Sequence, residues 1–201
     1  MRLQQPVDGY RVNEDSCRLA EFVPQRFAGR RVLDLGAGAG IIALLLAQRG
    51  FRRVVALELQ PCFAPYLAEN IQANGYAPRL SALMADGRRS SLPFHCRCCD
   101  VIVCNPPYQQ AAASRPPKTK MARLARQDTR LTLADVAALT GYLLVPGGHL
   151  FAILPKIRLA ELLRLFADHY MMAVKQMGQR VMVWIMKKEP RRSGAGQAPF
   201  P

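Results

Sequence analysis

The sequence lacks the features that would place the chain in or across a membrane. No apolar run approaches the ~18–20 residues that a helix needs to cross a bilayer. Residues 1–8 carry polar groups and a proline where a secretory signal peptide needs an apolar stretch. We therefore expect a cytoplasmic, monomeric protein of one domain, because 201 residues are enough to bury a substantial core.

Acidic residues are scarce. Asp and Glu number 14 against 28 Lys and Arg, which gives a net charge of +14. Residues 1–110 carry 13 basic and 9 acidic side chains, whereas residues 111–201 carry 15 and 5. An uneven surplus favours a polyanionic partner such as RNA, because phosphates attract it and release counterions on binding. The alternative is a solvated basic surface without a partner.

Cysteine is present but lacks the spacing of a metal site. Six cysteines occur in a chain without a secretory signal, so reduced thiols are expected. The run 95–99 packs four candidate ligands into five consecutive residues, which cannot easily wrap a tetrahedral ion. No second cluster complements that run, and we predict no metal.

Short β-rich runs alternate with helical runs from residue 31 onward. We expect strands at 31–35, 53–58, 80–83, 100–104 and 149–154, helices near 39–48, 65–74, 133–143 and 157–169, and a turn at 146–148. The closing runs 171–177 and 181–187 flank a tight turn, which predicts a hairpin with one antiparallel strand. The fold class is thus α/β, a single doubly wound Rossmann-like domain with a seven-stranded, mostly parallel sheet.

The domain is expected to cover residues 1–188. Its segment 1–30 precedes the first strand, and 111–130 forms a basic loop. Residues 189–201 are rich in Arg, Ser, Gly, Ala and Pro, which predicts a flexible tail.

A glycine-rich turn follows the first predicted strand. Gly36, Gly38 and Gly40 lie between that strand and a helix, where backbone can approach a ligand closely. A dinucleotide fingerprint would place its third glycine at position 41, which is isoleucine here. Asp34, just before the first of these glycines, can organise the turn and face a cationic amino-acid group. Taken alone, the turn could be a tight strand–helix joint.

Acidic residues also mark the next two strands. Glu58 ends the second strand, 22 residues after Gly36, where a carboxylate can accept both hydroxyls of a ribose. Asp86 follows the third strand, where it can accept a hydrogen bond from an adenine amino group. Since ligands of open α/β sheets bind outside the carboxyl ends of the strands, these acids should converge with Asp34 on one crevice.

The fourth predicted strand runs into Asn105, Pro106, Pro107 and Tyr108. The prolines remove two backbone donors and stiffen the chain. The Asn105 amide oxygen and the Pro106 carbonyl can each accept a hydrogen from a substrate NH2 group, which turns its nitrogen lone pair toward a methyl donor. Tyr108 supplies a ring on which a flipped base can stack. A rigid turn would explain only the prolines.

These segments resemble a known family. Residues 31–108 are similar to class I, Rossmann-like S-adenosylmethionine-dependent methyltransferases, and the tetrapeptide 105–108 resembles the NPPY motif of members that methylate amino groups. Segments 9–16, 19–24, 115–130 and 146–148 are similar to the bacterial tRNA(Val) adenine-N(6)-methyltransferase group. The cysteine-rich approach to the fourth strand and the short tail depart from that group.

The resemblance implies an N-methyltransferase that acts on adenine N(6) in tRNA. It places these residues at the cofactor, with segment 1–30 covering it: Tyr10, Arg11, Asp15, Asp34, Gly36, Gly38, Gly40, Glu58, Leu59, Asp86 and Asn105. Asn105, Pro106, Pro107 and Tyr108 would be catalytic. Basic residues that follow the tetrapeptide are expected to hold RNA phosphates, unless they form a solvated loop: Arg115, Lys118, Lys120, Arg123 and Arg126.

Two alternatives stay open. Glutamine N(5)-methyltransferases of translation release factors also carry Asn-Pro-Pro-Tyr, but they usually add a long N-terminal helical domain, and only about 30 residues precede the first strand here. A non-catalytic RNA-binding module is the other alternative. Such a module would keep only a degenerate cofactor site, and the intact set of Asp34, Glu58, Asp86 and Asn105 argues against this.

Overall fold

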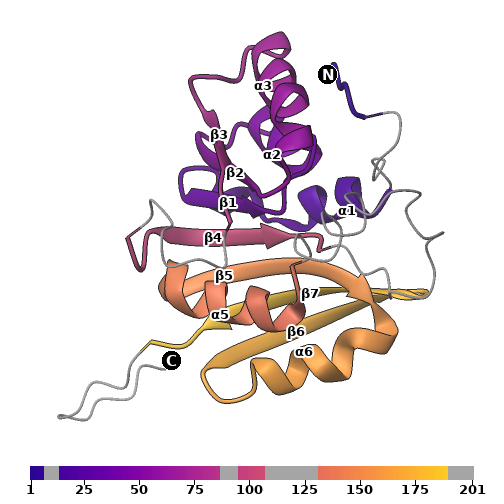
Figure 1. Ribbon diagram of the computed structural model, residues 1–201. Helices are drawn as coiled ribbons and strands as arrows, with labels where there is room; N and C mark the ends of the chain where they lie inside the picture. Colours follow the sequence, from indigo (N-terminus) through magenta and orange to yellow (C-terminus); the bar gives the residue numbers. More distant parts are fainter. Residues whose placement is uncertain (7–13, 87–94, 107–130, 190–201) are drawn as a thin grey trace.

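A seven-stranded sheet organises the part of the chain that the structure describes. The structure is a computed structural model, and it describes residues 1–6, 14–86, 95–106 and 131–189 (Figure 1). The strands follow the order β3-β2-β1-β4-β5-β7-β6. They are β1 (Arg31–Leu35), β2 (Arg53–Glu58), β3 (Leu80–Met84), β4 (Cys99–Cys104), β5 (Leu144–Pro155), β6 (Tyr170–Met177) and β7 (Arg180–Lys187).

Helices cover both faces of this sheet (Figure 1). On one face lie α1 (Glu14–Phe22), α2 (Ile41–Gln48) and α3 (Ala64–Ala73), and on the other lie α5 (Leu133–Leu143) and α6 (Leu159–Leu165). Three short 3-10 turns complete the described elements: η1 (Gln25–Phe27), η2 (Pro61–Phe63) and η3 (Lys156–Arg158). Within the described ranges, no helix has both the length and the apolar character needed to cross a membrane.

The strands alternate between two hydrophobic cores because successive side chains point to opposite faces of a sheet. Val32 and Val101 pack with the α1–α3 core, whereas Leu33 and Ile102 pack with the α5–α6 core. Parallel strands buried on both faces read as continuous apolar runs, which is why these segments were recognisable in the sequence.

The pairing confirms the predicted fold class. The neighbours from β3 across to β5 pair in parallel, and β7 pairs antiparallel with both β5 and β6. Gly178 has a φ of 60° in the turn of the β6–β7 hairpin, a left-handed conformation that glycine adopts at little cost. Six strands therefore run in one direction and β7 in the other.

Two local predictions were wrong. The expected turn at 146–148 lies inside β5, which starts at Leu144. β5 contains a bulge there: Cys99 of β4 pairs with Leu144, but Val101, two residues on, pairs with His149. The helix expected at 157–169 is only Leu159–Leu165, since η3 precedes it and the chain turns after Phe166. The tail after residue 189 lies outside the described residues, and the domain boundaries stay a prediction.

Of the glycines in the β5 bulge, Gly148 should be the one whose replacement by alanine is tolerated least. A Cβ there would lie 2.9 Å from the Val145 carbonyl oxygen and 3.1 Å from that of Asp100, and backbone cannot yield as a flexible side chain does. We expect Gly148→Ala to lower the free energy of unfolding by about 1–3 kcal/mol in urea titrations. The matched control is Gly29→Ala, where no atom lies within 4 Å of the new Cβ. Equal stability of the two variants would contradict this packing.

Candidate functional site

The turn between β1 and α2 is held against β2. The backbone N–H groups of Gly36 and Ala37 both donate to the Leu57 carbonyl oxygen, at 2.9 and 3.0 Å. The φ angles of Gly36, Gly38 and Gly40 are 77°, 57° and 88°, in the region that favours glycine. The predicted glycine turn therefore needs glycine at all three positions.

The first and third of these glycines have different surroundings. Among the described residues, no atom lies within 4 Å of the position that a Cβ on Gly36 would take, so none of them blocks the approach of a ligand to this backbone. A Cβ on Gly40 would lie 2.4 Å from Cδ1 of Leu67 in α3. Gly40 thus allows α3 to pack on the turn, whereas Gly36 leaves a bare surface at the carboxyl ends of the strands.

Asp34 is fully buried in β1 behind this turn. Its Oδ2 accepts a hydrogen bond from the backbone N–H of Ala43 at 3.0 Å, which ties the strand to the first turn of α2. Its Oδ1 has no hydrogen-bond partner among the described residues. Burial, partly offset by the Ala43 hydrogen bond and reinforced by the nearby Glu58 charge, raises the pKa of Asp34 to about 7. The site thus contains a buried acceptor suited to a cationic ligand.

Glu58 ties the end of β2 to the glycine turn. Its Oε2 accepts a hydrogen bond from the Gly38 N–H at 2.7 Å, and its Oε1 accepts from the N–H groups of Leu59 and Gln60 at 2.9 and 2.8 Å. The side chain is only 4% exposed. Three N–H donors orient the carboxylate and hold its charge beside the turn. The structure therefore brings Glu58, Leu59 and Gly38 together as the sequence predicted.

Asp86 follows β3 at the same edge of the sheet. The Ala85 N–H donates to the Glu58 carbonyl oxygen at 3.0 Å, which places Asp86 one residue beyond a direct link to β2. Its side chain is half-buried. Asp34, Glu58 and Asp86 thus mark the carboxyl ends of three adjacent strands, as expected from their positions in the chain.

Asn105 lies at the end of β4, between the sheet and α1. Its amide Nδ2 donates to Oγ of Ser16 at 3.1 Å. Ser16 is 2% exposed and belongs to the face of α1 that packs on the protein. Pro106, which follows Asn105, is buried.

Asp15, which is predicted to lie at the cofactor, forms an ion pair with the C-terminal hairpin. Its Oδ2 lies 2.9 Å from Nε of Arg180, at the start of β7, and the ion pair is only partly exposed. The carboxylate therefore connects α1 to the hairpin. A contact of Asp15 with a cofactor stays a prediction.

Two residues that the sequence pattern did not indicate support the site. Asn70 of α3 is 1% exposed and its Nδ2 donates to the Ala39 carbonyl oxygen at 2.9 Å, which fixes the glycine turn from behind. The same amide bonds to the backbone of Gln4 at 2.7 and 2.8 Å. The second residue is Ser16. A buried amide or hydroxyl on an otherwise apolar helix face was the available signal in each case.

Several predicted site residues lie outside the described residues. They are Tyr10, Arg11, Pro107, Tyr108, Arg115, Lys118, Lys120, Arg123 and Arg126. The cysteine-rich run is described: Cys99 is buried, Cys96 is exposed, and the sulfur atoms of Cys98 and Cys99 lie 3.5 Å apart. Within the described part of the chain, no three His, Cys, Asp or Glu side chains gather as metal ligands would.

Comparison with known proteins places this arrangement in a family. Residues 10–137 match the family described as the methyltransferase small domain. A tRNA1(Val) (adenine(37)-N6)-methyltransferase of Tolumonas auensis is 34% identical over 147 residues, which are 72% of this chain and 59% of the relative. The protein of the same name from Porphyromonas gingivalis is 31% identical over 90% of this chain and 72% of its own length. The chain therefore spans 59% of the first relative.

Solved structures agree on the fold. The Thermus thermophilus 16S rRNA N2 G1207 methyltransferase, in complex with AdoMet and guanosine, superposes with a TM-score of 0.62 at 26% identity, over 91% of this chain and 45% of that one. A predicted O-methyltransferase of Agrobacterium tumefaciens gives a TM-score of 0.64 at 20% identity, over 86% and 80% of the two chains.

Replacing Asp34 with asparagine should stabilise the ligand-free protein at high pH. With its pKa raised to about 7, the folded state keeps a proton that the unfolded chain loses near pH 4. The wild type therefore loses stability as the pH rises through this window, whereas a neutral amide does not. We expect Asp34→Asn to match the wild type near pH 4 and to exceed it by about 4 kcal/mol at pH 8 in urea unfolding, at about 1.4 kcal/mol per unit of raised pKa. A pH-independent difference would contradict the assigned burial.

Proposed function

The chain belongs to the methyltransferase small-domain family, and we propose that it transfers a methyl group from S-adenosylmethionine to N(6) of an adenine in tRNA. The observation that carries this proposal is the position of Asn105 at the end of β4, at the same sheet edge as the open Gly36 turn and Glu58. Relatives that bear the name of a tRNA adenine-N6-methyltransferase support the choice of substrate. Because tRNA is a cytoplasmic substrate, we also infer a cytoplasmic location.

The residues present fit S-adenosylmethionine. The bare backbone at Gly36 lets a ligand approach, and the unpartnered Oδ1 of Asp34 provides negative potential for a cationic group. Glu58, oriented by three N–H groups, has acceptor capacity left for ribose hydroxyls. Asp86 is proposed to accept from the adenine amino group. When bound, S-adenosylmethionine supplies an electrophilic methyl group.

The protein's part in the reaction is mostly orientation of two bound reactants. The Asn105 amide oxygen and the Pro106 carbonyl oxygen accept the two hydrogens of the target amine. These bonds draw the nitrogen lone pair out of conjugation and direct it to the methyl group. A strong base is not needed before transfer, because the amine loses its proton readily afterwards. Tyr108, outside the described residues, is proposed to stack on the base.

Ser16 takes the part of a positioning residue in this proposal. Its hydroxyl receives the Asn105 amide N–H and is itself 2% exposed in the packed face of α1. A buried partner limits rotation of the amide, so the oxygen that accepts from substrate keeps its direction. The ion pair of Asp15 with Arg180 holds the same helix against the hairpin.

The product identifies the substrate. Total tRNA is incubated with the protein and S-adenosylmethionine carrying an isotopically labelled methyl group, and the nucleosides are separated by mass spectrometry. We expect the label in N(6)-methyladenosine. The proposal fails if RNA stays unlabelled while a glutamine of a translation release factor becomes methylated, or if label appears in another nucleoside.

Substitution of Asn105 tests the role of the amide. Asn105→Ala should lower kcat by about 100-fold or more, because orientation of the amine is lost, while the Kd for S-adenosylmethionine changes by less than about threefold. Ser16→Ala keeps Asn105 but removes the hydrogen bond from its amide nitrogen to Ser16, so kcat should fall by a smaller factor with the same unchanged Kd. Calorimetry and single-turnover methylation separate the two quantities. A folded Asn105→Ala protein with near-normal kcat would contradict the mechanism.

A further inference from the structure

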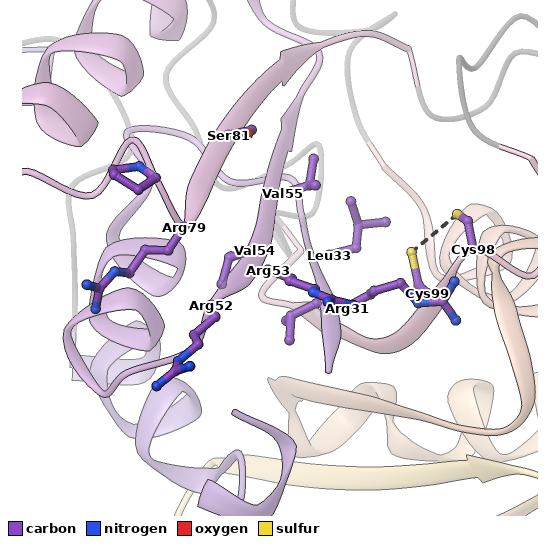
Figure 2. A pocket seen from close by; sticks show the side chains of 12 residues that line it. Arg31, Leu33, Arg52, Arg53, Val54, Val55, Arg79, Ser81, Cys98 and Cys99 are labelled. Carbon is purple, nitrogen blue, oxygen red and sulfur yellow. Dashed lines mark hydrogen bonds between the residues drawn. The ribbon is translucent and has the colours of Figure 1, made fainter. Parts of the chain in front are cut away.

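A hollow lies at the opposite edge of the sheet from the candidate site. It has a volume of about 250 Å³ and is lined at the amino ends of β1, β2 and β3 and the start of β4 (Figure 2). Four of its lining residues are arginines, Arg31, Arg52, Arg53 and Arg79, and Leu33 and Val55 line the same hollow. A cationic rim with apolar surface beside it is suited to a ligand that carries both phosphate and a less polar ring.

Three of the arginines form a row across adjacent strands. Arg31 of β1 is the direct register partner of Arg53 in β2. The Val54 N–H donates to the Arg79 carbonyl oxygen at 3.0 Å, which places Arg79 beside β2 as the chain enters β3. Because side chains alternate along a strand, Arg31 and Arg53 share the sheet face of Leu33 and Val55. Arg79 lies in the turn before β3, and its side chain extends on the side of Arg52 (Figure 2). Neighbouring strands lie about 4.8 Å apart, so the row extends over about 10 Å.

The positive charge of this row is largely uncompensated. Asp100 accepts from Nε and Nη2 of Arg31 at 2.9 and 3.1 Å, and this pairing lowers the pKa of the Asp100 carboxyl. The side chains of Arg52, Arg53 and Arg79 are exposed and have no hydrogen bond or ion pair to any described residue. Like charges on directly opposed strand positions destabilise a sheet. Asp100 offsets part of this repulsion at Arg31, and no described residue pairs with the side chain of Arg53.

We propose that this row binds phosphates of the RNA substrate, as a second contact at the edge opposite the chemistry. This inference rests on the proposed function. A row over three strands is longer than a single phosphate group, and its length fits successive phosphates of a nucleic-acid strand. β1 and β2 are five and six residues long, so the two edges are separated by about 17–20 Å. A folded RNA can reach both edges, which fixes its orientation without reading its sequence.

The test compares two variants that lose equal charge. Arg53→Gln with Arg79→Gln removes two arginines from the row, and Arg164→Gln with Lys175→Gln removes two exposed basic residues elsewhere. In filter binding to a full-length tRNA transcript, the row variant should bind about tenfold more weakly at 0.1 M salt. Its log–log salt slope should fall by about 1.4, or 0.7 per lost phosphate contact. The control variant should keep the wild-type slope.

Further measurements separate the outcomes. The Kd for S-adenosylmethionine should be the same in all variants, and Arg53→Lys with Arg79→Lys should restore most of the salt slope because charge is kept. If the wild type methylates tRNA but the row and control variants have the same tRNA affinity and the same salt slope, the RNA contact at the arginine row is overturned and the proposed function is not. If the row variant loses binding of adenosine monophosphate but not of tRNA, the hollow is a nucleotide site instead. If the wild type does not bind tRNA, the proposed function fails as well.

Discussion

The buried carboxyl group of Asp34 is the constraint on which the carboxyl edge of the sheet depends. One oxygen fixes the start of α2 through Ala43, and the other lies in the interior without a partner among the described residues. A carboxyl in that position costs free energy when charged, unless a cation approaches it. The glycine turn in front of it leaves backbone open at Gly36. Glu58 accepts the N–H of Gly38 in the same turn. A buried acceptor without a partner is typical of a binding site rather than of a structural joint.

The proposed methyl-transfer site and the arginine row lie at opposite edges of the same sheet. The carboxyl edge holds Asp34, Glu58, Asp86 and Asn105, where parallel strands bring their ends together. The amino edge holds the arginine row, which meets one carboxylate, that of Asp100. Because the strands are short, one partner can span both edges. The sheet thus holds the proposed amine site and the proposed RNA contact at a fixed distance from each other.

Local patterns were sufficient to predict most of the fold and part of the site. The strand ends at Glu58 and Cys104 and the glycine turn follow from apolar runs and turn residues, which act over a few positions. The β5 bulge could not be predicted, because Gly148 meets the backbone of Asp100 in another strand. The pair of Asp15 with Arg180 and the alignment of Arg31 with Arg53 likewise depend on pairing between distant segments. Such contacts are set by register, which a single sequence does not display.

The central claim is that a cationic cofactor binds against Asp34, and proton release on binding tests it most directly. Since the pKa of Asp34 is raised to about 7, the group is partly protonated at neutral pH. A cation beside it lowers that pKa, so S-adenosylmethionine should release about half a proton per site at pH 7. Calorimetric titration in two buffers of different ionisation enthalpy measures this release, which should vanish in Asp34→Asn. Equal binding enthalpies in both buffers, or the same release from the variant, would contradict the account.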